Sequence, residues 1–405
     1  MEKCIVCNKK TLKEVISLGV QPPADSFLMD CGLVESQKSY QLNCELCTSC
    51  GHLQNQVVVP NNERYEDIDY SYTSSNSNIS MSHWDEYYET VSSKVGLNDQ
   101  DSVVEFGSND GYLTELFNNK YNAIGIEPSP YLTNLSSEKG LKVINGYLGI
   151  DTLNEAVHEN GKCKLIYGNN VFNHISELNE STEAIRASLR KDGYFVFESP
   201  YCLDVIEKYY FDTIYHEHLS YFSIKSVDYL FRRNNLYIVD IERNSYHGGS
   251  VRVYSSPDKS RYNTDLVNKY IKNETELGLF DIVNYENFMK KIEKDKHSTV
   301  QSILKMKERG LSIAAVGAAA RSNTLLNYYK LDSSVIDFIT DSSEHKIGKY
   351  TPGSCIPILD DVALRERNPD VAIILSWNIG KFLIEKIQGI NPNMEVITIG
   401  GKELL

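Results

Sequence analysis

Residues 101–117, DSVVEFGSNDGYLTELF, pass from a strand pattern through a glycine-rich turn into a helix pattern. The letters SVVEF are typical of a short buried strand, and YLTELF begins an amphipathic helix. Gly107 and Gly111 allow the backbone to come close to a ligand at the N-terminus of that helix. The stretch therefore predicts an α/β fold with a ligand-binding loop after its first strand.

A second strand pattern, AIGIEPSP at 123–130, contains Glu127 near its end. In a doubly wound sheet, an acid at this position can accept hydrogen bonds from two ribose hydroxyls. The loop reads E-x-G-x-x-x-G from Glu105 to Gly111, whereas a pyrophosphate favours G-x-G-x-x-G. Glu105 and Asp110 suit a cationic sulfonium, so the pattern favours S-adenosylmethionine (SAM) over a dinucleotide. It resembles motif I of the class I SAM-dependent methyltransferases.

Two further strand patterns, KLIYGNNVFNHI at 164–175 and GYFVFESPY at 193–201, extend this sheet. Ligands of open α/β sheets bind at the carboxyl ends of the strands. At this edge Asn170 could instead cap a helix, and Glu198 could be a solvated strand end. We expect cofactor contacts from Glu105, Gly107, Asn109, Asp110, Gly111, Glu127, Asn169 and Asn170.

The first 50 residues hold six of the nine cysteines. Four of these cysteines form two CxxC motifs, CIVC at 4–7 and CTSC at 47–50, which have the spacing of zinc knuckles. Cys4, Cys7, Cys47 and Cys50 would close a tetrahedral Zn²⁺ site with no open position, so we expect a structural metal. Cys44 and Cys31 are expected to be spectators of this site, although Cys44 could replace Cys47 in a shifted register.

Composition bounds the function of this 405-residue chain. The net charge of −14 disfavours nucleic acid and anionic membranes as partners. No apolar run has the length of a membrane span or a signal peptide, so we expect a cytoplasmic protein. We predict three domains, namely a zinc-binding N-terminal domain at 1–75, a SAM-binding domain at 76–290 and a C-terminal domain at 291–405.

The C-terminal third contains a second strand–turn–helix pattern, GLSIAAVGAAARSNTLLNYYKL at 310–331. Strand patterns at 335–343, 369–377 and 395–401 complete a second Rossmann-like sheet. The turn lacks G-x-G-x-x-G, so we do not expect NAD. Arg321 at the start of the helix could bind phosphates, with Lys346 and Lys349 as helpers; alternatively, the domain is a scaffold and Arg321 is solvated.

The whole chain is similar to the sugar C-methyltransferases of bacterial deoxysugar pathways. The resemblance rests on CIVC…LGVQPPADSF…CTSCGHLQ, EFGSNDGYL, GNNVFNHI, FDTIYHEHLSYFS, HGGSVRVY and GAAARSNTLLNYY, which occur in the order of that family. It implies a class I SAM-dependent methyltransferase sheet between a small zinc-binding domain and a second Rossmann-like domain. It also implies a monomeric enzyme that methylates carbon 3 of a nucleotide-linked 4-keto-6-deoxy sugar.

The stretch DTIYHEHLSYFS at 212–223 carries the groups that such chemistry needs. Carbon methylation requires a base that removes a proton beside a ketone and a donor that stabilises the enolate. The resemblance implies that His218 is the base and that Tyr215 and Glu217 lie in the same site; His216 is a second candidate base. An extended backbone would alternate these side chains between two faces, whereas a tight turn would not. A metal held by His216 and His218 is the weaker alternative, since no HExxH helix is present.

The region 60–90 is polar and rich in tyrosine, which fits either a loop over a ligand or one packed between domains. The resemblance implies a catalytic tyrosine here; we favour Tyr72, directly before TSS, over Tyr70. The block at 247–254 is either near the sugar cleft or a plain hairpin. We expect substrate contacts from Tyr70, Asn170, His174, Ser250, Arg252 and Arg321.

Three functions remain open on the sequence. The first is a SAM-dependent C-methyltransferase of a nucleotide-linked ketosugar. The second is an O- or N-methyltransferase of a similar sugar, which needs no enolate. The third is a non-catalytic nucleotide-sugar-binding protein, which would have no affinity for SAM.

Overall fold

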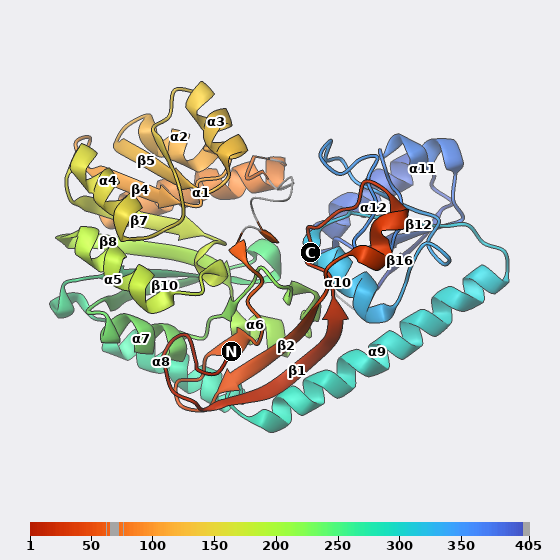
Figure 1. The fold of residues 1–405 in the computed structure, drawn as a ribbon, viewed down its shortest axis with the longest axis horizontal. Helices are drawn as coiled ribbons and strands as arrows, with labels where there is room; N and C mark the ends of the chain where they lie inside the picture. The colour runs from red at the N-terminus through yellow and green to blue at the C-terminus, as the bar shows by residue number, and fades with distance from the viewer. Residues whose placement is uncertain (62, 65–72, 76, 400–405) are drawn as a thin grey trace.

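The computed structural model describes residues 1–61, 63–64, 73–75 and 77–399. Figure 1 shows two α/β bodies, one on each side, with the N-terminal strands and the long helix α9 (Ile282–Glu308) running beneath and between them. The expected α/β class is confirmed. Among the described helices, none is both long enough and apolar enough to cross a bilayer.

The N-terminal sheet is built from two parts of the chain. Its strands, in the order β1-β2-β3-β9, are β1 (Leu12–Gln21), β2 (Tyr40–Cys47), β3 (Leu53–Asn55) and β9 (Ser220–Tyr221). The fourth strand belongs to the YHEH region, and β3 pairs with it through Leu53 and Tyr221. The zinc-binding domain is therefore joined by backbone hydrogen bonds to the stretch expected to carry catalysis.

The central sheet has seven strands in the order β10-β11-β8-β7-β4-β5-β6. Their bounds are β4 (Ser102–Phe106), β5 (Asn122–Glu127), β6 (Val143–Asn145), β7 (Cys163–Asn169), β8 (Leu189–Pro200), β10 (Tyr237–Asn244) and β11 (Ser250–Ser256). Strand β11 is antiparallel to both of its neighbours, and the pairs from β8 to β6 are parallel. The block at 247–254 thus opens the second strand of a hairpin.

Helices cover both faces of this sheet. The central helices are α1 (Asn78–Val95), α2 (Tyr112–Asn118), α3 (Pro130–Glu138), α4 (Ile150–Asn160), α5 (Leu178–Ser188), α6 (Cys202–Glu207), α7 (Ile224–Arg233) and α8 (Thr264–Glu276). Helices α1 and α2 bury Trp84 and Phe117 on one face, and α5 and α7 bury Ile185 and Phe231 on the other. Burying a large apolar side chain stabilises the fold by roughly 1.5–3 kcal/mol.

The C-terminal sheet is parallel, in the order β14-β13-β12-β15-β16. Its strands are β12 (Ile313–Val316), β13 (Phe338–Thr340), β14 (Ile358–Leu359), β15 (Val371–Ile374) and β16 (Glu395–Thr398), with helices α10 (Ala320–Tyr329), α11 (Val362–Arg367) and α12 (Gly380–Ile390). Its strand–turn–helix unit starts within the predicted stretch and places Arg321 in the first turn of α10.

Candidate active site

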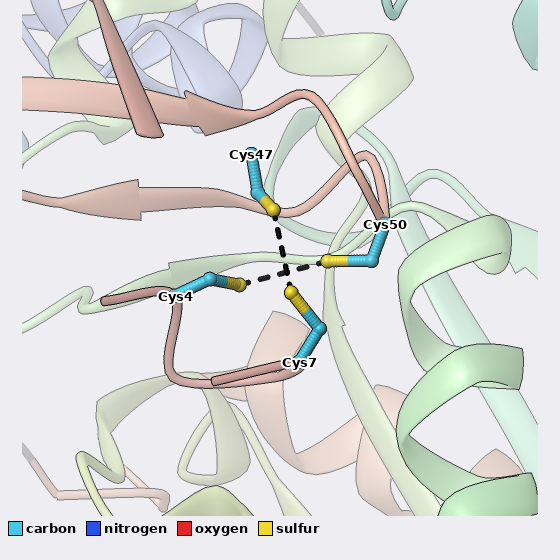
Figure 2. A group of neighbouring side chains, drawn as sticks. All are labelled: Cys4, Cys7, Cys47 and Cys50. Atoms are coloured by element: carbon cyan, nitrogen blue, oxygen red, sulfur yellow. Dashed lines mark hydrogen bonds between the residues drawn. The ribbon is translucent and has the colours of Figure 1, made fainter. Parts of the chain in front are cut away.

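Four buried cysteines gather at one point of the N-terminal domain (Figure 2). The Sγ atoms of Cys4 and Cys50 are 3.6 Å apart, those of Cys7 and Cys47 are 3.5 Å apart, and all four lie within 4.8 Å of one another. Four thiolates without an open position fit a structural zinc ion. Cys44 lies outside the cluster and donates to Asn55 Oδ1, so the shifted register is wrong.

A pocket of about 860 Å³, including its open mouth, lies at the carboxyl ends of the central strands. Glu127 is buried at its wall, where Oε2 accepts the backbone N–H of Asn109 and Oε1 accepts that of Ser129, each at 2.9 Å. Burial raises the pKa of Glu127. The pocket is lined by Gly107, Asn109, Glu127, Pro128, Ser129, Gly146, Tyr147, Asn170, Val171, His174 and neighbouring residues.

Asn170 is placed to meet a ligand in this pocket. It follows β7 with a positive φ of 54°, and its backbone N–H donates to the Glu198 carbonyl at 2.7 Å. Neither its amide nitrogen nor its amide oxygen has a hydrogen-bond partner among the described residues. A buried amide in this state is stabilised by a bound polar group. Together with Glu127, it makes the pocket fit SAM.

Four residues expected to contact the cofactor do not line this pocket. Glu105 faces the other side of β4, where it accepts from Thr114 Oγ1 and from Tyr167 Oη at 3.1 Å, and burial raises its pKa to about 8. The carboxylate of Asp110 instead accepts hydrogen bonds from the two serines at 74 and 75. The other two are Gly111 and Asn169.

The two glycines of the loop are required by packing as well as by backbone geometry. Gly107 has φ +65°, and a Cβ there would lie 2.4 Å from Val171 Cγ2. Gly111 has φ +78°, and its Cβ would lie 2.6 Å from Leu141 Cδ1. A side chain at either position would therefore displace a neighbour as well as strain the backbone.

The YHEH stretch is a tight turn, so the alternation of an extended strand does not apply. The N–H of His218 donates to the carbonyl of Tyr215 at 3.0 Å. Asn55 donates through Nδ2 to the carbonyls of Tyr215 and His218, at 2.8 and 2.9 Å. The zinc-binding domain thus holds both ends of the turn, although Asn55 is at least 160 positions away from it in the sequence.

His218 is buried with one ring nitrogen committed. Nδ1 lies 2.9 Å from the carbonyl of Thr213, so the neutral ring donates there and keeps a lone pair on Nε2. The ring centroid lies 3.9 Å from that of Tyr215 and 5.1 Å from that of His174. Burial, assisted by His174, holds the pKa of His218 well below its ordinary value. The imidazole is therefore unprotonated at neutral pH.

The other two titratable groups of the turn differ in their surroundings. Glu217 is 2% exposed, and neither carboxylate oxygen has a hydrogen-bond partner among the described residues. Burial and the nearby Asp25 raise its pKa to about 7. His216 instead lies against Tyr40, with Nε2 3.3 Å from the Tyr40 carbonyl. Within the described chain, the cysteine cluster is the metal-competent group of His, Cys, Asp or Glu, and His216 and His218 do not form one.

Arg321 of the C-terminal domain contacts the residues next to the YHEH turn. Its Nη2 donates to Thr213 Oγ1 at 3.0 Å and to the His247 carbonyl at 3.4 Å, and its guanidinium lies 4.9 Å above the Trp377 ring. Arg321 is 8% exposed, and Nη1 has no hydrogen-bond partner in the described part of the chain. The alternative of a solvated arginine is wrong. Thr213 therefore accepts a hydrogen bond from His218 on its carbonyl and one from Arg321 on its hydroxyl.

Two residues expected to contact the substrate, Ser250 and Arg252, instead bond to other groups of the protein. Ser250 donates to the carbonyl of Tyr246 at 2.9 Å. Arg252 is 2% exposed and pairs with Glu198 at 2.9 Å and with Glu86 at 3.1 Å. Glu198 also lies 2.7 Å from His83, so it is a buried ion-pair centre and not a solvated strand end. Tyr70 and Tyr72 lie outside the described residues.

Arg64 lines the pocket but is not among the site residues expected from the sequence. This arginine is 1% exposed, and its Nη1 donates to the carbonyl of His174 at 3.2 Å. It lies within the polar region 60–90, where an isolated arginine is usually solvated. His174, which was expected, also lines the pocket, and burial lowers its pKa to about 3.

Three family models match the chain in succession: a zinc binding domain at residues 4–65, a methyltransferase domain at 82–241 and a C-methyltransferase C-terminal domain at 245–397. The C-methyltransferase NovU of Streptomyces niveus is 28% identical over 387 residues, which are 95% of this chain and 92% of NovU. An uncharacterized methyltransferase of Oceanobacillus iheyensis is 31% identical over 119 residues, 28% of this chain and 53% of that protein.

Two solved structures are also similar to the chain. A SAM-dependent methyltransferase from Clostridium acetobutylicum matches with a TM-score of 0.34 and 14% identity, over 44% of this chain and 91% of that one. The magnesium protoporphyrin IX methyltransferase of Synechocystis, with bound SAM, matches with a TM-score of 0.33 and 11% identity, over 44% of this chain and 81% of that one.

Proposed function

The chain is a SAM-dependent methyltransferase with the zinc-binding, methyltransferase and C-terminal domains of a C-methyltransferase, and we propose that it methylates carbon 3 of a nucleotide-linked 4-keto-6-deoxy sugar. The observation that carries this proposal is the hydrogen bond from His218 Nδ1 to the Thr213 carbonyl, which leaves Nε2 as a buried, neutral base. O- or N-methylation does not require such a base beside a ketone.

In the proposed mechanism, His218 Nε2 removes the proton from the carbon beside the ketone. The Thr213 carbonyl stabilises the imidazolium that results, because it accepts from Nδ1 in both protonation states. The hydroxyl of Tyr215, whose ring lies against that of His218, donates to the enolate oxygen. Glu217, in the same turn, accepts a hydroxyl or an amine of the sugar.

The cofactor and the nucleotide would be held on two sides of this turn. Glu127 and Asn170 hold SAM, which supplies a methyl group already activated on sulfur. Arg321 binds a phosphate of the substrate through Nη1, since its other terminal nitrogen is bonded to Thr213. Binding both partners in line is the main contribution of the protein to methyl transfer.

We assign the enzyme to deoxysugar biosynthesis in the cytoplasm, acting as a monomer. A cluster of four thiolates that binds zinc suits a reducing compartment. The molar mass of the purified protein in solution, measured by light scattering, tests the oligomeric state. A dimer at the concentration of the assay would contradict the proposed monomer.

The test is mass spectrometry of a panel of nucleotide-linked 4-ketosugars incubated with protein and SAM in deuterated water. We expect one added methyl on carbon, located by NMR, and exchange at that carbon when SAM is replaced by S-adenosylhomocysteine. A His218→Asn variant is expected to lose both, while a His216→Asn control keeps them. A methyl found on oxygen or nitrogen would overturn the proposal.

A further inference from the structure

The segment 22–37 of the N-terminal domain crosses onto the C-terminal domain. Leu28 and Tyr350 exchange two backbone hydrogen bonds, at 2.9 and 2.7 Å, as in an antiparallel bridge. The N–H of Gly353 donates to Gln37 Oε1 at 2.9 Å. These bonds join parts of the chain more than 300 positions apart, and a covalent cross-link would strengthen the contact.

A cysteine from each side meets at this contact. Cys31 begins the short helix η1 (Cys31–Ser36), and Cys355 lies in the loop before β14; the two cysteines face each other with a Cα–Cα distance of 5.6 Å. That distance is within the range of natural disulfides. As expected, Cys31 is not part of the zinc cluster. We propose that Cys31 and Cys355 are a reversible redox staple between the N-terminal and C-terminal domains.

The staple lies close to the active site. The carbonyl of Ala24 accepts from Asn323 Nδ2 at 2.7 Å, and Asn323 is two positions after Arg321 on α10. Asp25, the next residue, interacts electrostatically with Glu217 of the YHEH turn and with Lys346. Closing the disulfide fixes the segment that carries Asp25 against Glu217. The staple therefore connects the redox state of two cysteines to the arrangement around the catalytic turn.

The chemistry needs a disulfide oxidant such as oxidised glutathione. The half-buried Cys31 is the more accessible of the two, since Cys355 is 7% exposed. Its thiolate attacks oxidised glutathione, forms a mixed disulfide and releases one glutathione thiolate. The Cys355 thiolate then attacks the sulfur of Cys31 and releases the second. Two protons leave the protein thiols, and two electrons pass to the oxidant. Reduced glutathione reverses both steps.

The remaining cysteines do not compete for this exchange. Four belong to the zinc cluster, and Cys44, Cys163 and Cys202 are 0–1% exposed in the core. Oxidation at the zinc cluster would release the metal, which gives it a separate signature. Staple formation is expected without zinc release.

The test uses the full zinc-loaded protein, equilibrated with oxidised or reduced glutathione, alkylated and digested without reduction. We expect a peptide pair cross-linked through Cys31 and Cys355 only in the oxidised sample, with zinc content unchanged. The oxidised form should melt about 5 °C higher, because a cross-link over 324 positions restricts the unfolded chain. Cys31→Ser and Cys355→Ser should each abolish this difference, while Cys202→Ser, as a buried control, keeps it.

Three results would overturn the staple. Both cysteines could remain fully alkylated after oxidised glutathione. The cross-link could resist reduced glutathione until the protein is unfolded, which would make it permanent and not reversible. Alternatively, the shift in melting temperature could persist in the Cys31→Ser variant. None of these measurements uses a sugar substrate, so they stand or fall independently of the proposed function.

Discussion

The clearest quantitative prediction concerns Glu105, which is buried beneath α2. Burial raises its pKa from 4.5 to about 8, although Thr114 and Tyr167 both donate to its Oε2 atom. Because the pKa of Glu105 is higher in the folded protein than in the unfolded chain, the neutral carboxyl group does not oppose folding below pH 4.5. As the pH rises towards 8, the free energy of unfolding falls. The difference of roughly 3.5 units, at about 1.4 kcal/mol each, makes the ionised group cost up to about 5 kcal/mol above pH 8.

Glu105→Gln removes the charge and keeps an oxygen that accepts both hydrogen bonds. The variant should therefore gain stability relative to the parent protein as the pH rises, from about 1 kcal/mol at pH 5 to at most about 5 kcal/mol at pH 8.5. Urea denaturation followed by circular dichroism at both pH values measures the difference. Glu115→Gln, an exposed acid of α2, is the control and should show no such trend. An equal effect of Glu105→Gln at pH 5 and pH 8.5 would refute the reasoning.

Three further perturbations address the site. His218→Asn should lower kcat by at least about 100-fold and leave SAM affinity unchanged in calorimetry, since an amide can still donate to the Thr213 carbonyl but cannot act as a base; normal turnover would exclude His218 as the base. Glu127→Ala should weaken SAM binding by roughly 1–3 kcal/mol, while Glu138→Ala, exposed at the end of α3, should not; equal affinities would refute the ribose assignment. Cys47→Ser should reduce bound zinc, measured by mass spectrometry, and melt the N-terminal domain earlier; full zinc content would show that the cluster is not the site.

Local patterns were enough to predict both Rossmann-like sheets and the zinc knuckles. SVVEF and AIGIEP are strands because short apolar runs end at turn residues, and two CxxC pairs have few other uses in one small domain. The alternation of side chains along a strand also bears on Glu105. In a strand, successive residues face opposite sides, so Val104 and Phe106 share the face opposite Glu105. That rule places Glu105 away from the pocket edge without any structure.

Long-range contacts could not be predicted in this way. The amide of Asn55 holds the carbonyls of Tyr215 and His218, and no periodicity connects positions 163 residues apart. The role of Arg252 was also hidden, since the sequence does not reveal that Glu86 of α1 and Glu198 of β8 both pair with its guanidinium. Sequence reasoning therefore recognised chemically suitable residues, and the fold decided which of them had free atoms.

The turn at 212–223 contacts both outer domains, and these contacts position the imidazole of His218. Its backbone is held by Asn55 of the N-terminal sheet, its threonine hydroxyl by Arg321 of the C-terminal domain, and its threonine carbonyl by His218 itself. A tight turn with buried, unpaired groups such as Glu217 is unfavourable when isolated, because each desolvated polar atom costs free energy. Packing from both outer domains offsets that cost. Removing zinc should therefore lower activity by disturbing the base, even though the four thiolates lie outside the cofactor pocket.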